Sequence, residues 1–138
     1  MIEFRIVKEF PPNLRERIWE IVKDVNSMPN YWKGIRELHV NKVADNMFEG
    51  EVRFAFPSTS RVRIEILDHS VILHFLSGIL KGTNRIDVQD SAITSTWRVE
   101  MPLYMKPFEG RNREHFSQGT EHALERIIET VRLTSMSS

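Results

Sequence analysis

Cysteine is absent from the sequence. The chain therefore forms no disulfide, carries no thiolate nucleophile and lacks the zinc sites that depend on thiolate ligands. This composition fits a reducing compartment. There is also no His-x-x-x-His or Glu-x-x-His pair, and His39, His69 and His74 are scattered along the chain. We expect no metal site and no cofactor.

A surplus of charge is missing as well, because 19 Lys and Arg balance 19 Asp and Glu. A general nucleic-acid binder usually carries a clear basic excess, so we expect no nucleic-acid partner. No apolar run approaches the roughly 20 residues that span a bilayer, which excludes integral membrane association. The first residues show no basic segment followed by an apolar run, so we expect no signal peptide and a cytoplasmic location.

The 138 residues, 41% hydrophobic and 28% charged, predict a single domain, 1–138, with one core. Residues 2–10 alternate in polarity and predict a strand, which Pro11 and Pro12 end. Apolar residues at helical spacing then predict a helix over 13–25. A turn-rich connector over 26–32, with room for one helical turn, carries Tyr31 and Trp32.

The hydrophobic period then changes from 3.6 to 2. The predicted strands are 35–43, 47–56, 60–67, 71–77, 80–89 and 92–104. Turn-forming residues separate them at 44–46, 57–59, 68–70, 77–79 and 90–91. Such short connections favour antiparallel neighbours, because a parallel crossover needs about a dozen residues.

The closing segment, 107–133, predicts one long amphipathic helix of roughly 40 Å. Its apolar or small stripe comprises Phe108, Phe116, Gly119, Ala123, Leu124, Ile127, Ile128 and Val131. The order of elements predicts an α+β fold, in which a curved antiparallel sheet of about seven strands wraps around the final helix. A helix of this length laid over a sheet can enclose a cavity.

This arrangement resembles the START/polyketide-cyclase-like superfamily, also called SRPBCC, whose architecture is known as helix-grip. The residues that carry the resemblance span the chain: Phe10-Pro11-Pro12, Ile18-Trp19, Asp24, Met28-Pro29-Asn30-Tyr31-Trp32, Gly50, Gly82-Thr83, Thr96-Trp97-Arg98-Val99-Glu100 and Gly119-Thr120-Glu121. The resemblance implies a hydrophobic pocket between the sheet and the C-terminal helix. The superfamily includes lipid carriers, plant ligand binders, aromatic polyketide cyclases and chaperone activators, and it shares no catalytic motif, so the activity stays open.

Strand alternation predicts which side chains face this pocket. Phe54, Phe56, Phe75 and Trp97 fall on inward faces and are predicted ligand-binding walls. Two polar residues, Asn84 and Ser95, interrupt these apolar faces. An unpaired buried polar group costs about 1–3 kcal/mol, so each needs a partner. They either orient the polar end of a ligand or satisfy a hydrogen bond within the protein.

Two residues of the final helix are further candidates. His115 lies at the edge of the apolar stripe, where it either contacts ligand or packs as a boundary histidine. It is the one candidate catalytic base if the protein is an enzyme. Gly119 costs up to about 1 kcal/mol relative to Ala within a helix, and close approach of the sheet or of a ligand explains such a choice.

Three functions fit these features. The leading hypothesis is binding or transport of a small hydrophobic or amphipathic ligand between the sheet and the helix. The alternatives are a polyketide cyclase or dehydratase that uses His115, and a protein-interaction module whose side chains fill the core and leave no cavity. Exposed edge strands allow a homodimer, although nothing in the sequence specifies one.

Overall fold

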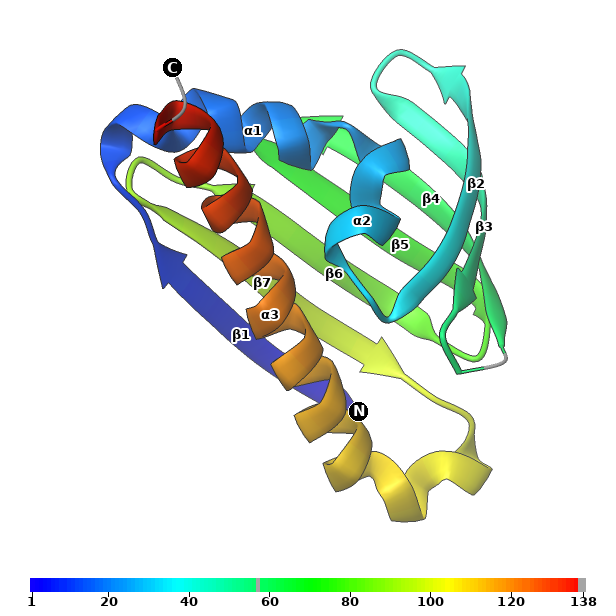
Figure 1. Ribbon diagram of the computed structural model, residues 1–138. Helices are drawn as coiled ribbons and strands as arrows, with labels where there is room; N and C mark the ends of the chain where they lie inside the picture. Colours follow the sequence, from blue (N-terminus) through cyan, green and yellow to red (C-terminus); the bar gives the residue numbers. More distant parts are fainter. Residues whose placement is uncertain (57, 137–138) are drawn as a thin grey trace.

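The computed structural model describes residues 1–56 and 58–136, so Pro57 of the predicted 57–59 turn lies outside the described residues. Seven strands form one antiparallel sheet in the order β1-β7-β6-β5-β4-β3-β2 (Figure 1). Their bounds are β1 Ile2–Glu9, β2 Ile35–Ala44, β3 Met47–Phe54, β4 Thr59–Leu67, β5 Ser70–Gly78, β6 Lys81–Val88 and β7 Ala92–Glu100. From β2 to β7, consecutive strands are hydrogen-bonded neighbours, as the short turns predict.

Helical segments occupy the two long connections. Between β1 and β2 lie the 3-10 helix η1 (Pro12–Leu14), α1 (Arg15–Lys23), the 3-10 helix η2 (Val25–Ser27) and α2 (Met28–Tyr31). After β7 come the 3-10 helix η3 (Leu103–Phe108) and the 28-residue helix α3 (Glu109–Met136). The helices α1 and α3 cover the same face of the sheet, and the sheet curls toward them at β2 and β3 (Figure 1). The predicted α+β helix-grip architecture is confirmed.

The junction between the last strand and the final helix differs from the prediction. The strand was expected to reach 104, but β7 ends at Glu100, which pairs with Lys81 at the start of β6; its pairing with β1 ends one residue earlier, at Val99 opposite Ile2. The helix was expected from 107, but it begins at Glu109, after η3, which contains Pro107. Phe108 therefore lies before α3 and is 47% exposed, off the apolar stripe of the helix.

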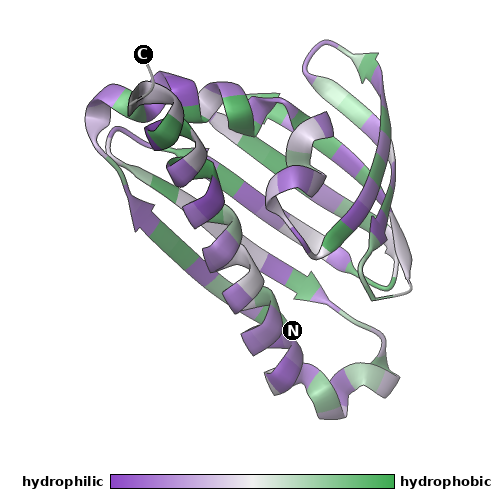
Figure 2. Cartoon of the chain, viewed as in Figure 1, coloured by the Kyte–Doolittle hydropathy of each residue, from purple (hydrophilic) through white to green (hydrophobic). Residues whose placement is uncertain are grey.

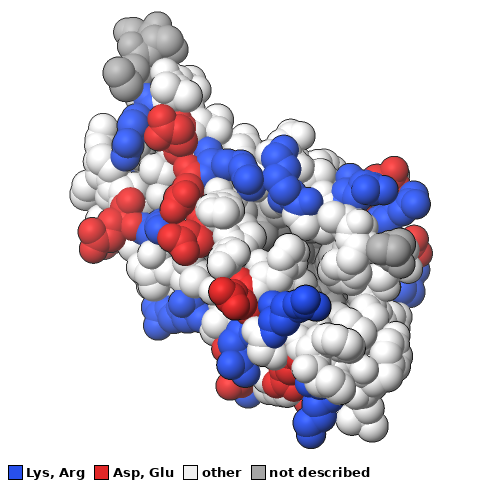
Figure 3. Space-filling view, turned by 60° about the horizontal axis from the view of Figure 1, so that its bottom comes forward, with Lys and Arg blue, Asp and Glu red and all other residues white. Residues whose placement is uncertain are grey.

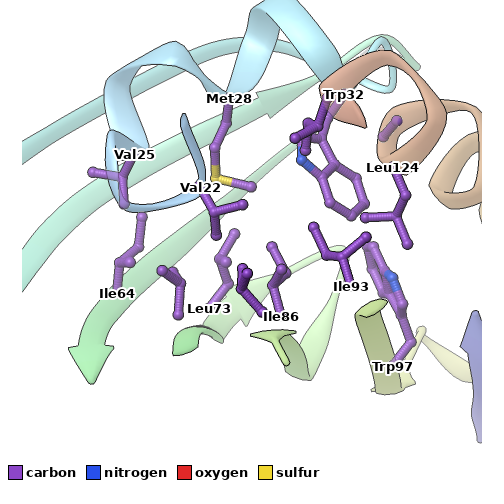
Figure 4. Close-up of a cluster of buried hydrophobic side chains, with 14 of the residues drawn as sticks. Val22, Val25, Met28, Trp32, Ile64, Leu73, Ile86, Ile93, Trp97 and Leu124 are labelled. Carbon is purple, nitrogen blue, oxygen red and sulfur yellow. The ribbon is translucent and has the colours of Figure 1, made fainter. Parts of the chain in front are cut away.

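The core lies between the sheet and the helices. Alternating hydropathy along the strands, visible in Figure 2, places one apolar face of each inner strand toward α1 and α3. In Figure 4, Val22 and Met28 from the α1–α2 region point toward Leu73 and Ile86 of the sheet. On α3, the residues Thr120, Ala123, Leu124, Ile127, Ile128 and Val131 are buried. This packing fills one end of the sheet–helix space and leaves the other end for the site.

An ion-pair cluster fixes α3 across the sheet. The Lys8 ammonium on β1 lies 2.9 Å from Oε1 of Glu121 and 3.1 Å from Oε1 of Glu125. The hydrogen bond to Glu121 raises the pKa of Lys8, and the same bond lowers the pKa of Glu121. The charged forms of these groups are therefore favoured together.

Candidate ligand-binding cavity

A cavity of about 490 Å³ lies between the sheet, the start of β2 and α3. Its volume falls within the roughly 300–1,000 Å³ of typical small-molecule sites. Its described lining comprises Trp32, Lys33, Gly34, Ile35, Phe54, Ala55, Phe56, Leu73, Phe75, Leu80, Asn84, Trp97, His115, Phe116, Gln118, Gly119, Thr120, His122 and Arg126. The space-filling view of Figure 3 shows one face hollowed at its centre, with both basic and acidic side chains near the hollow.

Aromatic side chains make up much of the cavity wall. Phe54 contacts Phe75 with ring centroids 6.1 Å apart, and Phe75 stacks on Trp97 at 6.0 Å. Trp97 stacks on Phe116 of α3 at 5.7 Å, Phe116 lies 6.4 Å from Phe56, and Phe56 stacks on Phe54 at 5.0 Å. Each ring thus contacts the next around a closed set, which we call the aromatic circuit (Phe54, Phe56, Phe75, Trp97 and Phe116). Such rings offer flat apolar surfaces to a ligand.

The polar groups on the inner wall are few and buried. Ser95, fully buried, donates a hydrogen bond of 2.7 Å to Oδ1 of Asn84, which is 1% exposed. The hydroxyl of Thr120 and the indole nitrogen of Trp97 are also buried, and neither has a hydrogen-bond partner within the described residues. An apolar cavity with a small number of polar groups is the usual make-up of a site that orients its ligand.

The outer part of the lining is polar and cationic. Lys33 precedes β2, and His115, His122 and Arg126 project from α3. Arg126 donates a hydrogen bond of 2.8 Å from Nη1 to the carbonyl oxygen of Tyr31, which holds its guanidinium beside the connector. The described lining contains no Asp or Glu. The charged side chains of the described lining are therefore basic, although the whole chain is neutral.

All of the predicted ligand-binding residues except Ser95 line the cavity. Ser95 lies behind Asn84 and contributes through it, since its hydroxyl holds the Asn84 amide. His115 is exposed and stands at the outer end of the lining. A Cβ atom added at Gly119 would meet nothing within 4 Å, so the sheet does not approach this glycine closely. Whether these residues bind ligand stays a prediction.

Several lining residues were not among the sequence candidates. Thr120 was detectable, because it is a polar residue one helical turn after Phe116, within the buried stripe of α3. The sequence pattern did not mark Lys33 and Arg126 as cavity residues, since charged residues are common in connectors and at the edges of helices. Their place at the cavity follows from the packing of α3 against the connector.

The cavity offers few groups for catalysis. Its described lining holds no carboxylate that could orient His115 and no serine or cysteine nucleophile. Elsewhere in the described part of the chain, no cluster of three or more His, Cys, Asp or Glu residues could hold a metal ion. Within the same residues, none of the helices combines the length and apolar character needed to cross a membrane.

Comparison with solved structures finds the same fold in proteins of low sequence identity. A protein from Thermus thermophilus superposes with a TM-score of 0.75 at 14% identity, covering 97% of this chain and 98% of its own. An aromatase/cyclase from Streptomyces sp. R1128 gives 0.63 at 12% identity, covering 95% and 92%. A STAR-related lipid transfer protein from Xanthomonas axonopodis gives 0.59 at 9% identity, covering 94% of this chain and 85% of the other.

No family model matches the sequence, and no curated protein matches it. The structural likenesses define the class of fold: this chain has the helix-grip fold found in aromatase/cyclases and a STAR-related lipid transfer protein. The predicted superfamily resemblance is thereby confirmed at the level of the fold. The fold alone does not assign an activity, so the chemistry of this chain has to be argued from its own cavity.

Proposed function

We propose that this protein binds or transports a small hydrophobic or amphipathic molecule in the cavity between its sheet and α3. The observation that supports the proposal best is the open space of about 490 Å³ bounded by the aromatic circuit. Burial of apolar ligand surface would contribute about 25 cal/mol per Å² before the cost of association. The polar outer end suits an amphipathic ligand.

The open cavity and its lining favour this proposal over the two alternatives. A ligand-free interaction module was expected to fill the space with side chains, whereas about 490 Å³ remains open. A cyclase or dehydratase requires an acid or base that is held in position, and His115 has neither a carboxylate nor a second catalytic group beside it in the described lining. Binding or transport therefore fits the site better than catalysis.

A steric block provides the test. Gly119 lines the cavity and Gly110 does not, and a Cβ atom at either position meets nothing within 4 Å. We expect Gly119→Phe to place its ring at the cavity and weaken binding of the fluorescent probe anilinonaphthalene sulfonate by about tenfold or more. Gly110→Phe, which puts the same ring on the same helix, is expected to bind as the unmodified protein does.

Native mass spectrometry of the purified protein would supply the second readout. A co-purified apolar molecule that is present in the Gly110→Phe variant and absent from the Gly119→Phe variant would support the proposed cavity. If both variants fold by circular dichroism and bind the probe equally well, the cavity is not the binding site. Cytoplasmic location, a homodimer and the independence from a cofactor stay predictions.

A further inference from the structure

Arg126, in the cavity lining, differs from the other half-buried basic residues because it has no carboxylate partner. Among the described residues, Lys8, Arg15 and Arg126 are half-buried, and the other Lys and Arg residues are exposed. Lys8 lies 2.9 Å from Glu121, and Arg15 lies 3.7 Å from Asp90. Arg126 forms no ion pair with an Asp or Glu of the described residues. Charged groups that are partly removed from water are normally paired, so the unpaired guanidinium calls for a partner from outside the chain.

The neighbouring carboxylates on α3 are paired with other basic groups. Glu125, which precedes Arg126 in the chain, lies 3.1 Å from the Lys8 ammonium on β1. Glu129, which lies about one helical turn after Arg126, is 3.7 Å from Arg132. The helix that carries Arg126 therefore supplies no counter-ion for it.

The guanidinium of Arg126 is held in place and keeps donors to spare. Its Nη1 donates a hydrogen bond of 2.8 Å to the carbonyl oxygen of Tyr31. A guanidinium has five N–H donors, so four remain after this bond. Two of them can bind the two oxygens of one carboxylate in parallel, which is the usual geometry between arginine and a carboxylate. Arg126 alone is therefore sufficient to recognise such a group.

The residue next to this hydrogen bond belongs to the aromatic wall. Tyr31, which accepts the bond, precedes Trp32, and the indole of Trp32 lies 6.4 Å from that of Trp97 in the aromatic circuit. Figure 4 shows Trp32 and Trp97 pointing toward Leu124 of α3. Trp32, Trp97 and Arg126 all line the cavity. The lining thus combines an apolar aromatic wall with a half-buried cation at its edge.

We propose that the ligand is an amphipathic acid whose carboxylate binds Arg126 while its apolar body lies against the aromatic circuit. This inference rests on the proposed ligand-binding function, and it adds to that function the class of ligand and the residue that selects it. The carboxylate is then at the outer end of the ligand, and the apolar body enters the cavity first. A neutral apolar molecule of the same shape would leave the Arg126 guanidinium without a counter-ion.

A pair of probes that differ in charge but hardly in shape tests the proposal. Anthracene-2-carboxylate and the neutral anthracene-2-carboxamide have the same flat ring system, so titration of both at about pH 7 measures the value of the negative charge. We expect the unmodified protein to bind the carboxylate about tenfold more tightly than the carboxamide, as for a hydrogen-bonded charged pair.

Two substitutions at Arg126 separate its charge from its hydrogen-bonding geometry. Arg126→Gln removes the charge but keeps an amide that can donate to the Tyr31 carbonyl, and it is expected to abolish most of the preference for the carboxylate. The affinity for the carboxamide is expected to change less than about twofold. Arg126→Lys keeps the charge without the planar fork and is expected to retain part of the preference.

A control variant and the salt dependence show whether the contact is direct. Arg113→Gln removes the same charge from an exposed residue of α3 that pairs with Glu109 and lies outside the cavity lining, so it is expected to keep the preference. The effect of Arg126→Gln is expected to persist when the salt is raised from about 0.01 M to about 1 M, because a partly buried pair is screened much less than exposed charges.

The outcomes distinguish this inference from the proposed function. Equal affinity of the unmodified protein for the two probes, or a preference that Arg126→Gln leaves unchanged, would overturn the role of Arg126 and leave the cavity function standing. The same holds if Arg126→Gln weakens both probes equally, since Arg126 then acts only by holding the connector, or if Arg113→Gln reduces the preference as much. If neither probe binds the unmodified protein, the binding of flat apolar ligands fails, and the selection of acids fails with it.

Discussion

The turn between β4 and β5 contains a histidine with strong local interactions. His69 has a φ of 56°, in the left-handed region, and its ring stacks on Trp19 with centroids 5.2 Å apart. Its Nδ1 lies 2.6 Å from Oδ1 of Asp68, and its Nε2 lies 2.8 Å from Oε1 of Glu16. The hydrogen bond to Asp68, followed by that to Glu16, raises the pKa of His69 above its usual value. The turn is therefore stabilised by the protonated ring.

Because the pKa of His69 is raised, the effect of His69→Asn on the stability of the protein is expected to depend on pH. Asn tolerates the left-handed conformation, so the substitution removes the charged contacts and the stacking on Trp19 without straining the turn. A histidine whose pKa is higher in the folded state stabilises the protein fully below its unfolded pKa, about 6.5, and loses that contribution as the pH rises through the folded value. We expect the substitution to lower the free energy of unfolding by about 1 kcal/mol or less at about pH 5.5. At about pH 8.5 the loss is expected to be smaller.

Urea unfolding at the two pH values measures this loss. His39→Asn is the matched control, because the side chain of His39 is 76% exposed on β2 and lies 3.3 Å from Glu37. A loss of stability in the His69 variant that is the same at both pH values would show that the ring acts by packing on Trp19 and not through its charge.

Among the elements, α3 is both a long continuous helix and one wall of the cavity. It must stay continuous over 28 residues, and it must leave space at the cavity. Gly119 lines the cavity within this helix, although glycine is a poor helix former. A Cβ atom at this position meets nothing within 4 Å.

We therefore expect Gly119→Ala to raise the free energy of unfolding by up to about 1 kcal/mol, since the helix gains a better helix former without a clash. Ligand affinity is expected to change by less than about twofold, because one methyl group removes little of the cavity. Thermal unfolding and probe titration measure both quantities. Gly110→Ala, in the first turn of α3, is expected to give a smaller gain. A lower stability of the Gly119→Ala variant would show that the backbone requires glycine at this position.

The elements also show where sequence reasoning succeeds and where it fails. Periods of 2 and 3.6 are properties of contiguous residues, so the strands and the long helix were predictable with ends that differ by a few residues. The end of β7 was not, because it depends on pairing with two other strands: Glu100 lies opposite Lys81 of β6, and Val99 lies opposite Ile2 of β1. The hydrogen bond between Ser95 and Asn84 could not be predicted from the sequence either. Alternation places both residues on inward faces, but it does not give the register between β6 and β7.

At the scale of the whole molecule, the charges are balanced in number but unevenly placed. The chain has 19 basic and 19 acidic residues, yet the described cavity lining includes Lys33 and Arg126 and no acidic residue. On α3, Glu121 is paired with Lys8, whereas Glu114 accepts a hydrogen bond of 3.4 Å from Gln118, a residue of the lining. From the basic residues of the lining we expect the outer end of the cavity to favour an anionic group on a ligand over a neutral one.

Comparison of naphthoate with the neutral naphthamide tests this uneven placement of charge. We expect Lys33→Gln to weaken naphthoate binding by about threefold at low salt, in the range of an exposed ion pair, and to leave naphthamide unchanged. The difference is expected to shrink when the salt is raised from about 0.01 M to about 1 M, because the Debye length falls from about 30 Å to about 3 Å. Lys42→Gln, at an exposed residue paired with Asp45 and outside the cavity lining, is the control. If Lys33→Gln weakens the binding of naphthoate and naphthamide equally, the lysine acts through the shape of the entrance. If Lys33→Gln and Lys42→Gln weaken naphthoate binding equally, the net charge of the protein alone sets the attraction.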